Sequence, residues 1–268
     1  MKRRVFFVSD HTGITAEAMG RSLLSQFGSL KFKCRQQPFI DSVDKARRLA
    51  EEINLSAEKS GLQPLVFCTL ADPTVLNCLH HSSAAVFDLF STFTHPLEKV
   101  LHADAAPTSV SVHGISNEGL YSERIQAMNF AFTNDDGSIT KNYDHADLIL
   151  IGVSRSGKTP TSLYLGLQYS ILAANYPLTG DDLEKSSLPQ PLQGHRHKLF
   201  GLSIDPRNLQ HIREQRRPNS RYASLQQCRF ETDQALLMYQ KLDIPYIDTT
   251  MMSVEEIAAR ILAMRFDN

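Results

Sequence analysis

The feature that most constrains this chain is an apolar run that leads into a phosphate-binding motif. Residues 148–151 read Leu-Ile-Leu-Ile, and residues 152–159, Gly-Val-Ser-Arg-Ser-Gly-Lys-Thr, match G-x-x-x-x-G-K-[ST]. Such a loop joins a buried strand to a helix, and its backbone amides and the helix start attract phosphate oxygens. The match predicts an α/β fold with a phosphate site in this stretch, called the phosphate loop below. The alternative is a tight strand-to-helix turn with a chance lysine.

Each residue of the phosphate loop is a candidate ligand contact: Gly152, Val153, Ser154, Arg155, Ser156, Gly157, Lys158 and Thr159. Lys158 is expected to act catalytically by reaching the terminal phosphates, and the Thr159 hydroxyl is expected to bind Mg²⁺. Pro160 follows and has no N–H. It either starts the helix, where such amides are spare, or removes one amide usually offered to the inner phosphates and so alters the register of the nucleotide.

Apolar runs and helical patterns alternate along the whole chain. Strands are expected at 5–8, 32–40, 64–70, 84–90, 147–151, 198–204 and 244–247. Helices are expected at 16–27, 43–55, 74–80, 121–132, 161–174, 207–217 and 231–242, with a last helix opened by a capping box at Ser253–Glu256. Residues 177–197 read as a loop with at most one short strand. The order predicts two α/β domains: an N-terminal, mostly parallel sheet domain at 1–140 and a P-loop kinase-like domain at 141–268.

Composition limits the classes of function. The formal net charge is -1, which provides no field for nucleic acid or a membrane surface. Neither a signal segment nor a membrane span is recognisable, and the four cysteines are spaced like reduced thiols, so we expect a cytoplasmic protein. The ten histidines lack neighbouring ligands at metal-binding spacing.

A basic segment follows the expected strand at 198–204. Arg207, Arg213, Arg216, Arg217 and Arg221 fall within it, and Arg213 and Arg217 are spaced to share a helix face. We interpret Arg213 and Arg217 as catalytic groups that neutralise phosphoryl charge, against the alternative of a solvated basic helix. Asp205 ends the strand as a Walker-B aspartate would and is a third catalytic candidate, although Asp-Pro also opens turns.

The N-terminal stretch Val8–Glu17 repeats the order of strand, small polar loop and helix. Its Ser9, Thr12, Gly13 and Thr15 either bind an anion at the helix start or cap the helix. Capping, with Thr15 as the N-cap residue, is the favoured interpretation.

Five segments together resemble one protein family, the phosphoenolpyruvate synthase regulatory proteins, which are bacterial relatives of the pyruvate, phosphate dikinase regulatory protein. They are VSDHTGITAE at 8–17, ERIQAMNFAF with DDG at 123–137, GVSRSGKTPTS at 152–162, KLFGLSIDP at 198–206 and IDTTMMSVEEIA at 247–258. The likeness runs nearly end to end, and the proline after the loop threonine is part of the family pattern.

The resemblance implies a bifunctional enzyme. One reaction transfers the β-phosphate of ADP to a threonine of phosphoenolpyruvate synthase and inactivates it, and the other removes that phosphate with inorganic phosphate and releases pyrophosphate. The phosphate loop, Gly152 to Thr159, carries over as the ADP site, while no motif fixes the general base. Other targets remain open: the related dikinase, a metabolite phosphorylated from ATP, or nucleotide sensing without turnover. A homodimer is the default expectation.

Overall fold

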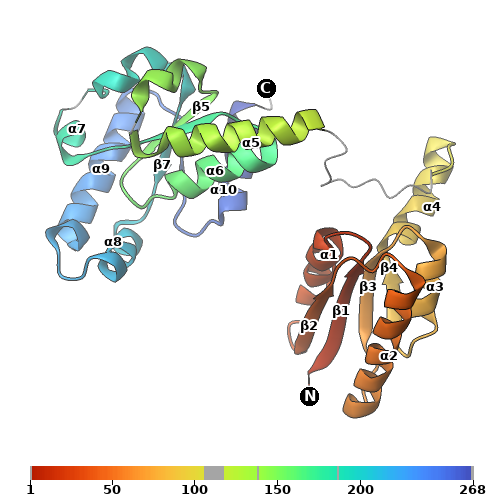
Figure 1. Cartoon of the computed structure of the whole chain (residues 1–268). Helices are drawn as coiled ribbons and strands as arrows, with labels where there is room; N and C mark the ends of the chain where they lie inside the picture. Colours follow the sequence, from red (N-terminus) through yellow and green to blue (C-terminus); the bar gives the residue numbers. More distant parts are fainter. Residues whose placement is uncertain (1, 106–117, 138, 186, 267–268) are drawn as a thin grey trace. The chain divides into compact units, whose positions relative to one another are not determined.

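The chain forms two compact units, residues 1–114 and 115–268 (Figure 1). The computed structural model describes residues 2–105, 118–137, 139–185 and 187–266. Each unit contains a four-stranded sheet in which all recorded strand pairs are parallel. The α/β fold predicted from the sequence is therefore confirmed. None of the described helices has the length and apolarity needed to span a bilayer.

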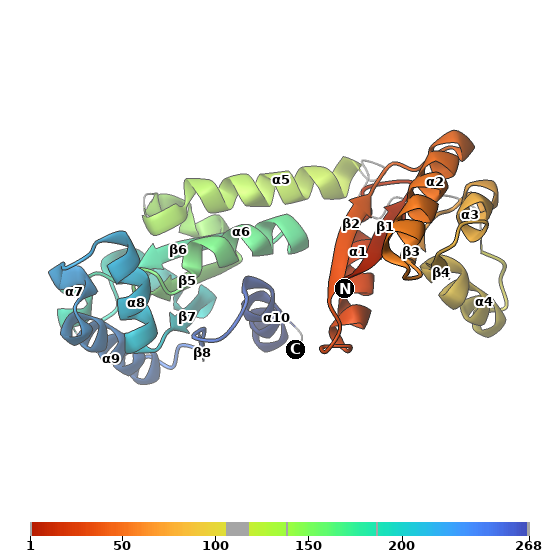
Figure 2. The same ribbon diagram turned by 90° about the horizontal axis from the view of Figure 1, so that it is seen from below.

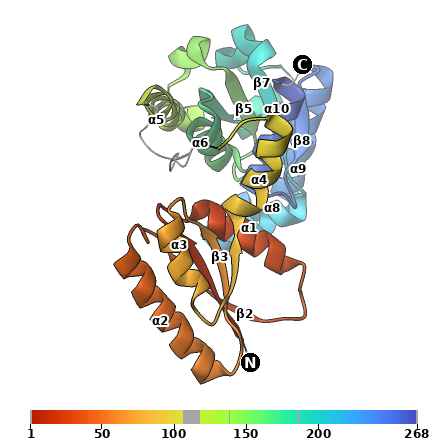
Figure 3. The same cartoon turned by 90° about the vertical axis from the view of Figure 1, so that its right-hand side faces the viewer.

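The first unit alternates strands and helices. Its elements are β1 (Arg3–Ser9), α1 (Ile14–Ser25), β2 (Phe32–Gln37), α2 (Val43–Ser60), β3 (Leu65–Thr69), α3 (Pro73–His80), β4 (Ala85–Asp88) and α4 (Leu89–Leu101). The strand order is β2-β1-β3-β4. Alternate residues of β1 explain the layers: Phe6 and Val8 join a core with α2 and α3, whereas Val5 and Phe7 pack with α1. Figure 3 shows α1 on one side of this sheet and α2 with α3 on the other.

The second unit repeats this strand order, β6-β5-β7-β8. Its elements are α5 (Glu118–Thr133), η1 (Asp135–Gly137), η2 (Thr140–His145), β5 (Leu148–Gly152), α6 (Lys158–Tyr169), β6 (Ala173–Pro177), α7 (Gly180–Glu184), η3 (Gln190–Lys198), β7 (Leu199–Ser203), α8 (Pro206–Arg216), η4 (Arg221–Ala223), α9 (Leu225–Lys241), β8 (Tyr246–Asp248) and α10 (Val254–Arg265). Leu148 and Leu150 of β5 pack with α6 and α10, while Ile149 and Ile151 pack with α7, α8 and α9. Both faces of the sheet are covered, as a parallel sheet requires.

Helix α5 belongs to the second unit, because it packs along α6 (Figure 2). The contact is close: a Cβ added at Gly166 of α6 would lie 3.0 Å from the backbone carbonyl of Ala127 in α5. The turn signal at 134–137 predicted a boundary near residue 140 and left this helix in the first domain, whereas the units divide after residue 114. The difference arises because that turn is not a linker. It folds beside β6 instead.

Three local predictions need correction. Helix α6 ends at Tyr169 and Ser170 adopts a left-handed conformation; β6 follows at Ala173–Pro177, where the sequence predicted the end of the helix and the start of a loop. Helix α1 is capped by Gly13 at φ 76, without a side-chain cap, so Thr15 is not its N-cap residue. Helix α9 begins at Leu225 behind the N-cap Ser224, earlier than expected. The capping box at Ser253 is confirmed.

The tight α5–α6 contact predicts that Gly166 cannot accept a larger side chain. In Gly166→Val the new atoms would meet backbone atoms of Ala127 and Met128, which cannot rotate away. We expect a loss of about 1–3 kcal/mol in the free energy of unfolding, the usual cost of overpacking, measured by urea denaturation. Gly194→Val is the matched control, because nothing lies within 4 Å of the position that a Cβ would take there. Equal stability of the two variants would contradict the close packing.

Candidate functional site

The phosphate loop leaves the sheet at the carboxyl end of β5. Gly152 is the last residue of β5 and Lys158 is the first of α6, as the motif predicts. A Cβ at Gly152 would lie 2.6 Å from the Leu202 carbonyl oxygen and 2.8 Å from the Ser156 hydroxyl, so only glycine fits here. Gly157 and Arg155 both have positive φ, at 92° and 78°. These left-handed residues turn the loop into the start of α6. In parallel α/β sheets, ligands bind beside the carboxyl ends of the strands, where this loop lies.

Lys158 is buried without a counter-ion. Its side chain is 4% exposed, and its Nζ donates a hydrogen bond of 3.0 Å to the Val153 carbonyl. It forms no ion pair with any residue in the described part of the chain. Burial lowers the pKa of Lys158 to about 8, while the charges of Asp136 and Asp135 act in the opposite direction. A buried ammonium group of this kind is stabilised by an anion, which a phosphate would supply.

A cavity of about 250 Å³ opens in front of this lysine. Its lining comprises Asp136, Ser154, Arg155, Gly157, Lys158, Thr159 and Pro160. Pro160 is the third residue of α6, a position in the first turn where the backbone amide has no partner within the helix. Its effect on the register of a nucleotide stays a prediction. The lining brings two cationic residues, Lys158 and Arg155, to one cavity.

Two neighbouring aspartates, the acid pair Asp135 and Asp136, complete the site. The Thr159 hydroxyl donates to Asp135 Oδ1 at 2.8 Å, and the Asn175 amide donates to the same oxygen at 2.5 Å. Asn175 Oδ1 in turn accepts the Asp136 backbone amide at 3.0 Å. In the sequence analysis these two aspartates appeared only as part of the DDG segment, and no role was predicted for them. The contact of Asp135 with Thr159 was not predicted, and β6, which holds Asn175, was not predicted either.

The donor set fits a magnesium ion held mainly by substrate phosphates. Mg²⁺ commonly takes one or two protein oxygens and completes its shell with phosphate and water. Thr159 is the residue that would supply a protein oxygen, with Asp135 orienting its hydroxyl. The described residues contain no group of three or more histidine, cysteine or carboxylate side chains that would bind a metal unaided.

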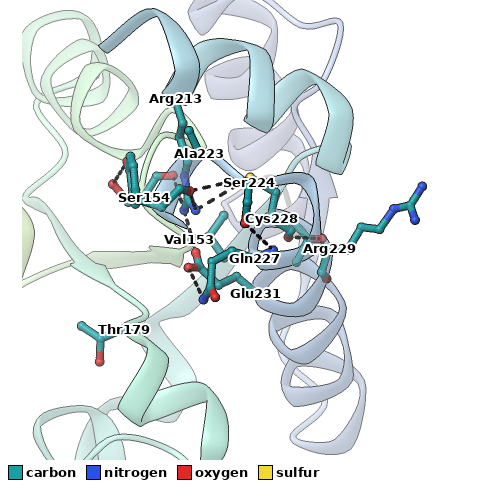
Figure 4. A network of polar contacts seen from close by, with 12 residues as sticks. Val153, Ser154, Thr179, Arg213, Ala223, Ser224, Gln227, Cys228, Arg229 and Glu231 are labelled. Carbon is teal, nitrogen blue, oxygen red and sulfur yellow. Dashed lines mark hydrogen bonds and ion pairs between the residues drawn. The ribbon is translucent and has the colours of Figure 1, made fainter. Parts of the chain in front are cut away.

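Arg213 holds the phosphate loop through a hydrogen bond to the Ser154 carbonyl (Figure 4). It is fully buried, and its NH2 group donates to Glu231 Oε2 at 2.6 Å and to the Ser154 carbonyl at 3.1 Å. Its NH1 group donates to the Tyr222 carbonyl, and its guanidinium stacks 4.1 Å from the Tyr222 ring centroid. Tyr222 also contacts the Ser154 hydroxyl through its own hydroxyl at 3.0 Å. Arg213 is therefore committed to holding the loop rather than presented to the cavity.

The other two catalytic candidates lie outside the cavity lining. Asp205 is the N-cap of α8 and accepts the amides of Arg207 and Asn208, which matches the turn-opening alternative. Arg217 is exposed, because α8 ends at Arg216 and Arg217 has non-helical angles. The expected shared face of Arg213 and Arg217 is consequently absent: one side chain is buried and the other is exposed. Arg155 is the arginine that the structure brings to the site.

The first unit has a cavity of about 620 Å³ at the corresponding edge of its sheet. Asp10, His11, Asp41 and Asp72 line it together with apolar residues, and no lysine or arginine does. Asp10 Oδ1 lies 2.9 Å from His11 Nδ1. Three carboxylates disfavour a phosphate here, whereas Lys158 and Arg155 line the cavity of the second unit.

Comparisons with known proteins cover nearly the whole chain. Residues 5–262 match the family model described as "Kinase/pyrophosphorylase". A Pseudomonas fluorescens (strain SBW25) protein, named "Putative phosphoenolpyruvate synthase regulatory protein", is 51% identical over 98% of this chain and 96% of its own length. A protein of the same name from Marinobacter nauticus is 50% identical over 98% and 97%. A solved LacI transcriptional regulator from Lactobacillus brevis aligns with 10% identity, covering 92% of this chain and 98% of its own, at a TM-score of 0.20, which carries no structural argument.

The buried pair of Arg213 and Glu231 predicts a strong coupling between the two side chains. Arg213→Met leaves Glu231, which is 9% exposed, without its counter-charge. We expect a loss of about 3–5 kcal/mol in the free energy of unfolding. The double variant Arg213→Met/Glu231→Met removes both charges and should recover a large part of that loss. A double-mutant cycle by chemical denaturation measures the coupling, and additive single effects would contradict it.

The lowered pKa of Lys158 predicts that phosphate binding weakens in mild alkali. Below its pKa of about 8 the free protein already carries the charge that a phosphate contacts. Above it the lysine must first take up a proton, so the dissociation constant for ADP should rise about tenfold per pH unit. Calorimetric titrations from about pH 7 to about pH 9.5 measure this. Lys158→Arg stays charged and should show a flat profile. A flat wild-type profile would contradict the assignment.

Proposed function

We propose that this chain, which belongs to the kinase/pyrophosphorylase family, regulates phosphoenolpyruvate synthase by reversible phosphorylation of a threonine. In one direction it transfers the β-phosphate of ADP to the threonine hydroxyl and releases AMP. In the other, inorganic phosphate removes the phosphoryl group and pyrophosphate leaves. The family establishes a kinase and pyrophosphorylase, and the names of the relatives point to the synthase as the target. The choice of ADP and threonine is our proposal.

The observation that carries the proposal is the unpaired, buried Lys158 at the base of the phosphate cavity. Its ammonium group donates to a backbone carbonyl and forms no ion pair with the described residues, so a diphosphate would supply the direct counter-charge. Arg155 lines the same cavity and supplies a second cation. Both reactions need this, because ADP, phosphate and pyrophosphate are all anions whose charge must be neutralised during transfer.

The phosphate loop positions the reacting groups. Lys158 and Arg155 hold the phosphoryl oxygens, and the start of α6 directs backbone amides at them. Thr159, oriented by Asp135, would hold Mg²⁺, which when bound neutralises phosphate charge. Arg213 keeps the Ser154 carbonyl tied back, so that it does not face the incoming anion. Catalysis in this arrangement consists mainly of positioning and charge neutralisation.

A labelling experiment tests the proposal. The protein is incubated with histidine-phosphorylated phosphoenolpyruvate synthase, Mg²⁺ and ADP labelled in the β-phosphate, and the synthase is analysed for phosphothreonine. We expect label on threonine, and release of labelled pyrophosphate when unlabelled phosphate is then added. Lys158→Ala should lose transfer by about 10²–10³-fold, the usual effect of removing a group that stabilises transition-state charge.

The outcomes separate the alternatives. Label on a small molecule, or transfer from ATP instead of ADP, would identify a different kinase. Nucleotide binding without transfer would identify a sensor. A Lys158→Ala variant with wild-type transfer would show that the phosphate loop is not the site of the reaction.

A further inference from the structure

We infer that Tyr222 is a positioning residue for the phosphate cavity: its hydroxyl donates to the Ser154 hydroxyl, which in turn donates to a phosphoryl oxygen of the bound substrate. The inference rests on the proposed function and deepens it, because it names a residue outside the phosphate loop that strengthens the binding of ADP and of inorganic phosphate. Tyr222 lies 68 residues from Ser154 in the sequence, and no motif connects the two.

The two hydroxyl groups lie within hydrogen-bond distance of each other. Tyr222 Oη is 3.0 Å from Ser154 Oγ, and either oxygen can be the donor. This is the one hydrogen bond that either hydroxyl makes within the described part of the chain. Ser154 lines the phosphate cavity together with Lys158 and Arg155. Because a serine hydroxyl has a single proton to donate, the direction of this bond decides what Ser154 can offer to a ligand.

An anion in the cavity selects one direction of the bond. If Ser154 donates to Tyr222, only its lone pairs remain for the ligand, and an anion gains nothing from them. If Tyr222 donates instead, the Ser154 proton is available to a phosphoryl oxygen, and the two successive hydrogen bonds strengthen each other. A hydrogen bond to a charged acceptor is stronger than one between neutral groups, so phosphate binding favours the order from Tyr222 to Ser154 to phosphate.

The buried Arg213 favours the same direction. Its guanidinium lies 4.1 Å from the centroid of the Tyr222 ring, and its NH1 group donates to the Tyr222 carbonyl at 3.1 Å. A positive charge over a phenol ring favours release of the hydroxyl proton, which makes Tyr222 the better donor of the pair. Glu231 holds Arg213 in turn, at 2.6 Å. The ring is therefore fixed by one face and by its own backbone.

The surroundings of Tyr222 are held together without its hydroxyl. In η4 the Ser220 side chain accepts the Ala223 amide at 3.3 Å, and Ser224 accepts the Gln227 amide as the N-cap of α9. Tyr222 is half-buried, so water can replace a lost hydrogen bond there. It does not belong to the cavity lining. Tyr222 therefore acts on a ligand through Ser154 alone, and its hydroxyl can be removed without loss of packing.

The variant Tyr222→Phe tests the inference, because phenylalanine keeps the ring against Arg213 and removes only the hydroxyl. We expect the dissociation constants of ADP and of inorganic phosphate, measured by calorimetry at about pH 7, to rise about three- to tenfold, the usual effect of one lost hydrogen bond. The KM for ADP in the transfer assay should rise with them. The kcat should stay within about twofold, because ground state and transition state lose the same contact. The melting temperature should not change.

A double-mutant cycle separates positioning from a structural role. In the Ser154→Ala background, Tyr222→Phe should weaken binding no further, because no serine hydroxyl is left to orient. Tyr246→Phe is the matched control. Tyr246 is also half-buried, and it packs against another aromatic ring, that of Tyr239, with centroids 5.5 Å apart. It lies outside the cavity lining, so its variant should bind ADP and phosphate as the wild-type protein does.

The possible outcomes distinguish this inference from the proposed function. Wild-type affinities in Tyr222→Phe, full additivity with Ser154→Ala, or a lower melting temperature would each overturn the role of Tyr222. A fall in kcat at unchanged KM would overturn it as well. The binding measurements need no synthase, so they do not depend on threonine transfer. If the expected affinities are found but no threonine is phosphorylated, the proposed function fails and the positioning role of Tyr222 in phosphate binding stands.

Discussion

The site of the second unit depends on two buried cations that the protein compensates in different ways. Arg213 is fully buried and is neutralised by Glu231, and its NH1 and NH2 groups also donate to the Tyr222 and Ser154 carbonyls. Lys158 is buried too, yet its partner is only a backbone carbonyl. Burial of an uncompensated charge is costly, and a group in that position lowers its pKa or recruits an anion. The first cation bonds to the loop backbone through the Ser154 carbonyl, whereas the second is left without an ion pair among the described residues.

The sequence predicted the parts of this arrangement that local patterns encode. The strand before the phosphate loop, the helix after it and the capping box at Ser253 follow from apolar runs and short-range hydrogen bonds. Residues 173–177 carry a weak pattern, and they form a strand because they pair with β5 along its whole length. Because β6 was not predicted, the position of Asn175 and of the acid pair that it contacts could not be predicted either. Pairing between distant segments is not visible in a local window, which explains this loss.

Arginine roles were the least predictable part of the site. Charge and spacing identified a basic segment, but they do not distinguish an arginine that faces phosphate from one that is paired inside. The distinction depends on Glu231, which lies 18 residues away in sequence from Arg213 and one helix further along the chain. Helix α8 ends at Arg216, so Arg217 does not share a helix face with Arg213, which the spacing alone did not reveal. Arg155, in contrast, lies in the cavity lining, because its position within the loop motif fixes its surroundings, and its contact with a ligand stays a prediction.

The two units show why a shared fold does not determine chemistry. Their strand orders, β2-β1-β3-β4 and β6-β5-β7-β8, are equivalent. Both units have a cavity beside the carboxyl ends of the strands. In the first unit three aspartates and His11 line that cavity, and in the second Lys158, Arg155 and Asp136 do. Cationic side chains in a cavity lining attract an anion, whereas several carboxylates disfavour it. The charged residues that line each cavity, rather than the shared fold, therefore decide which ligands the cavity favours.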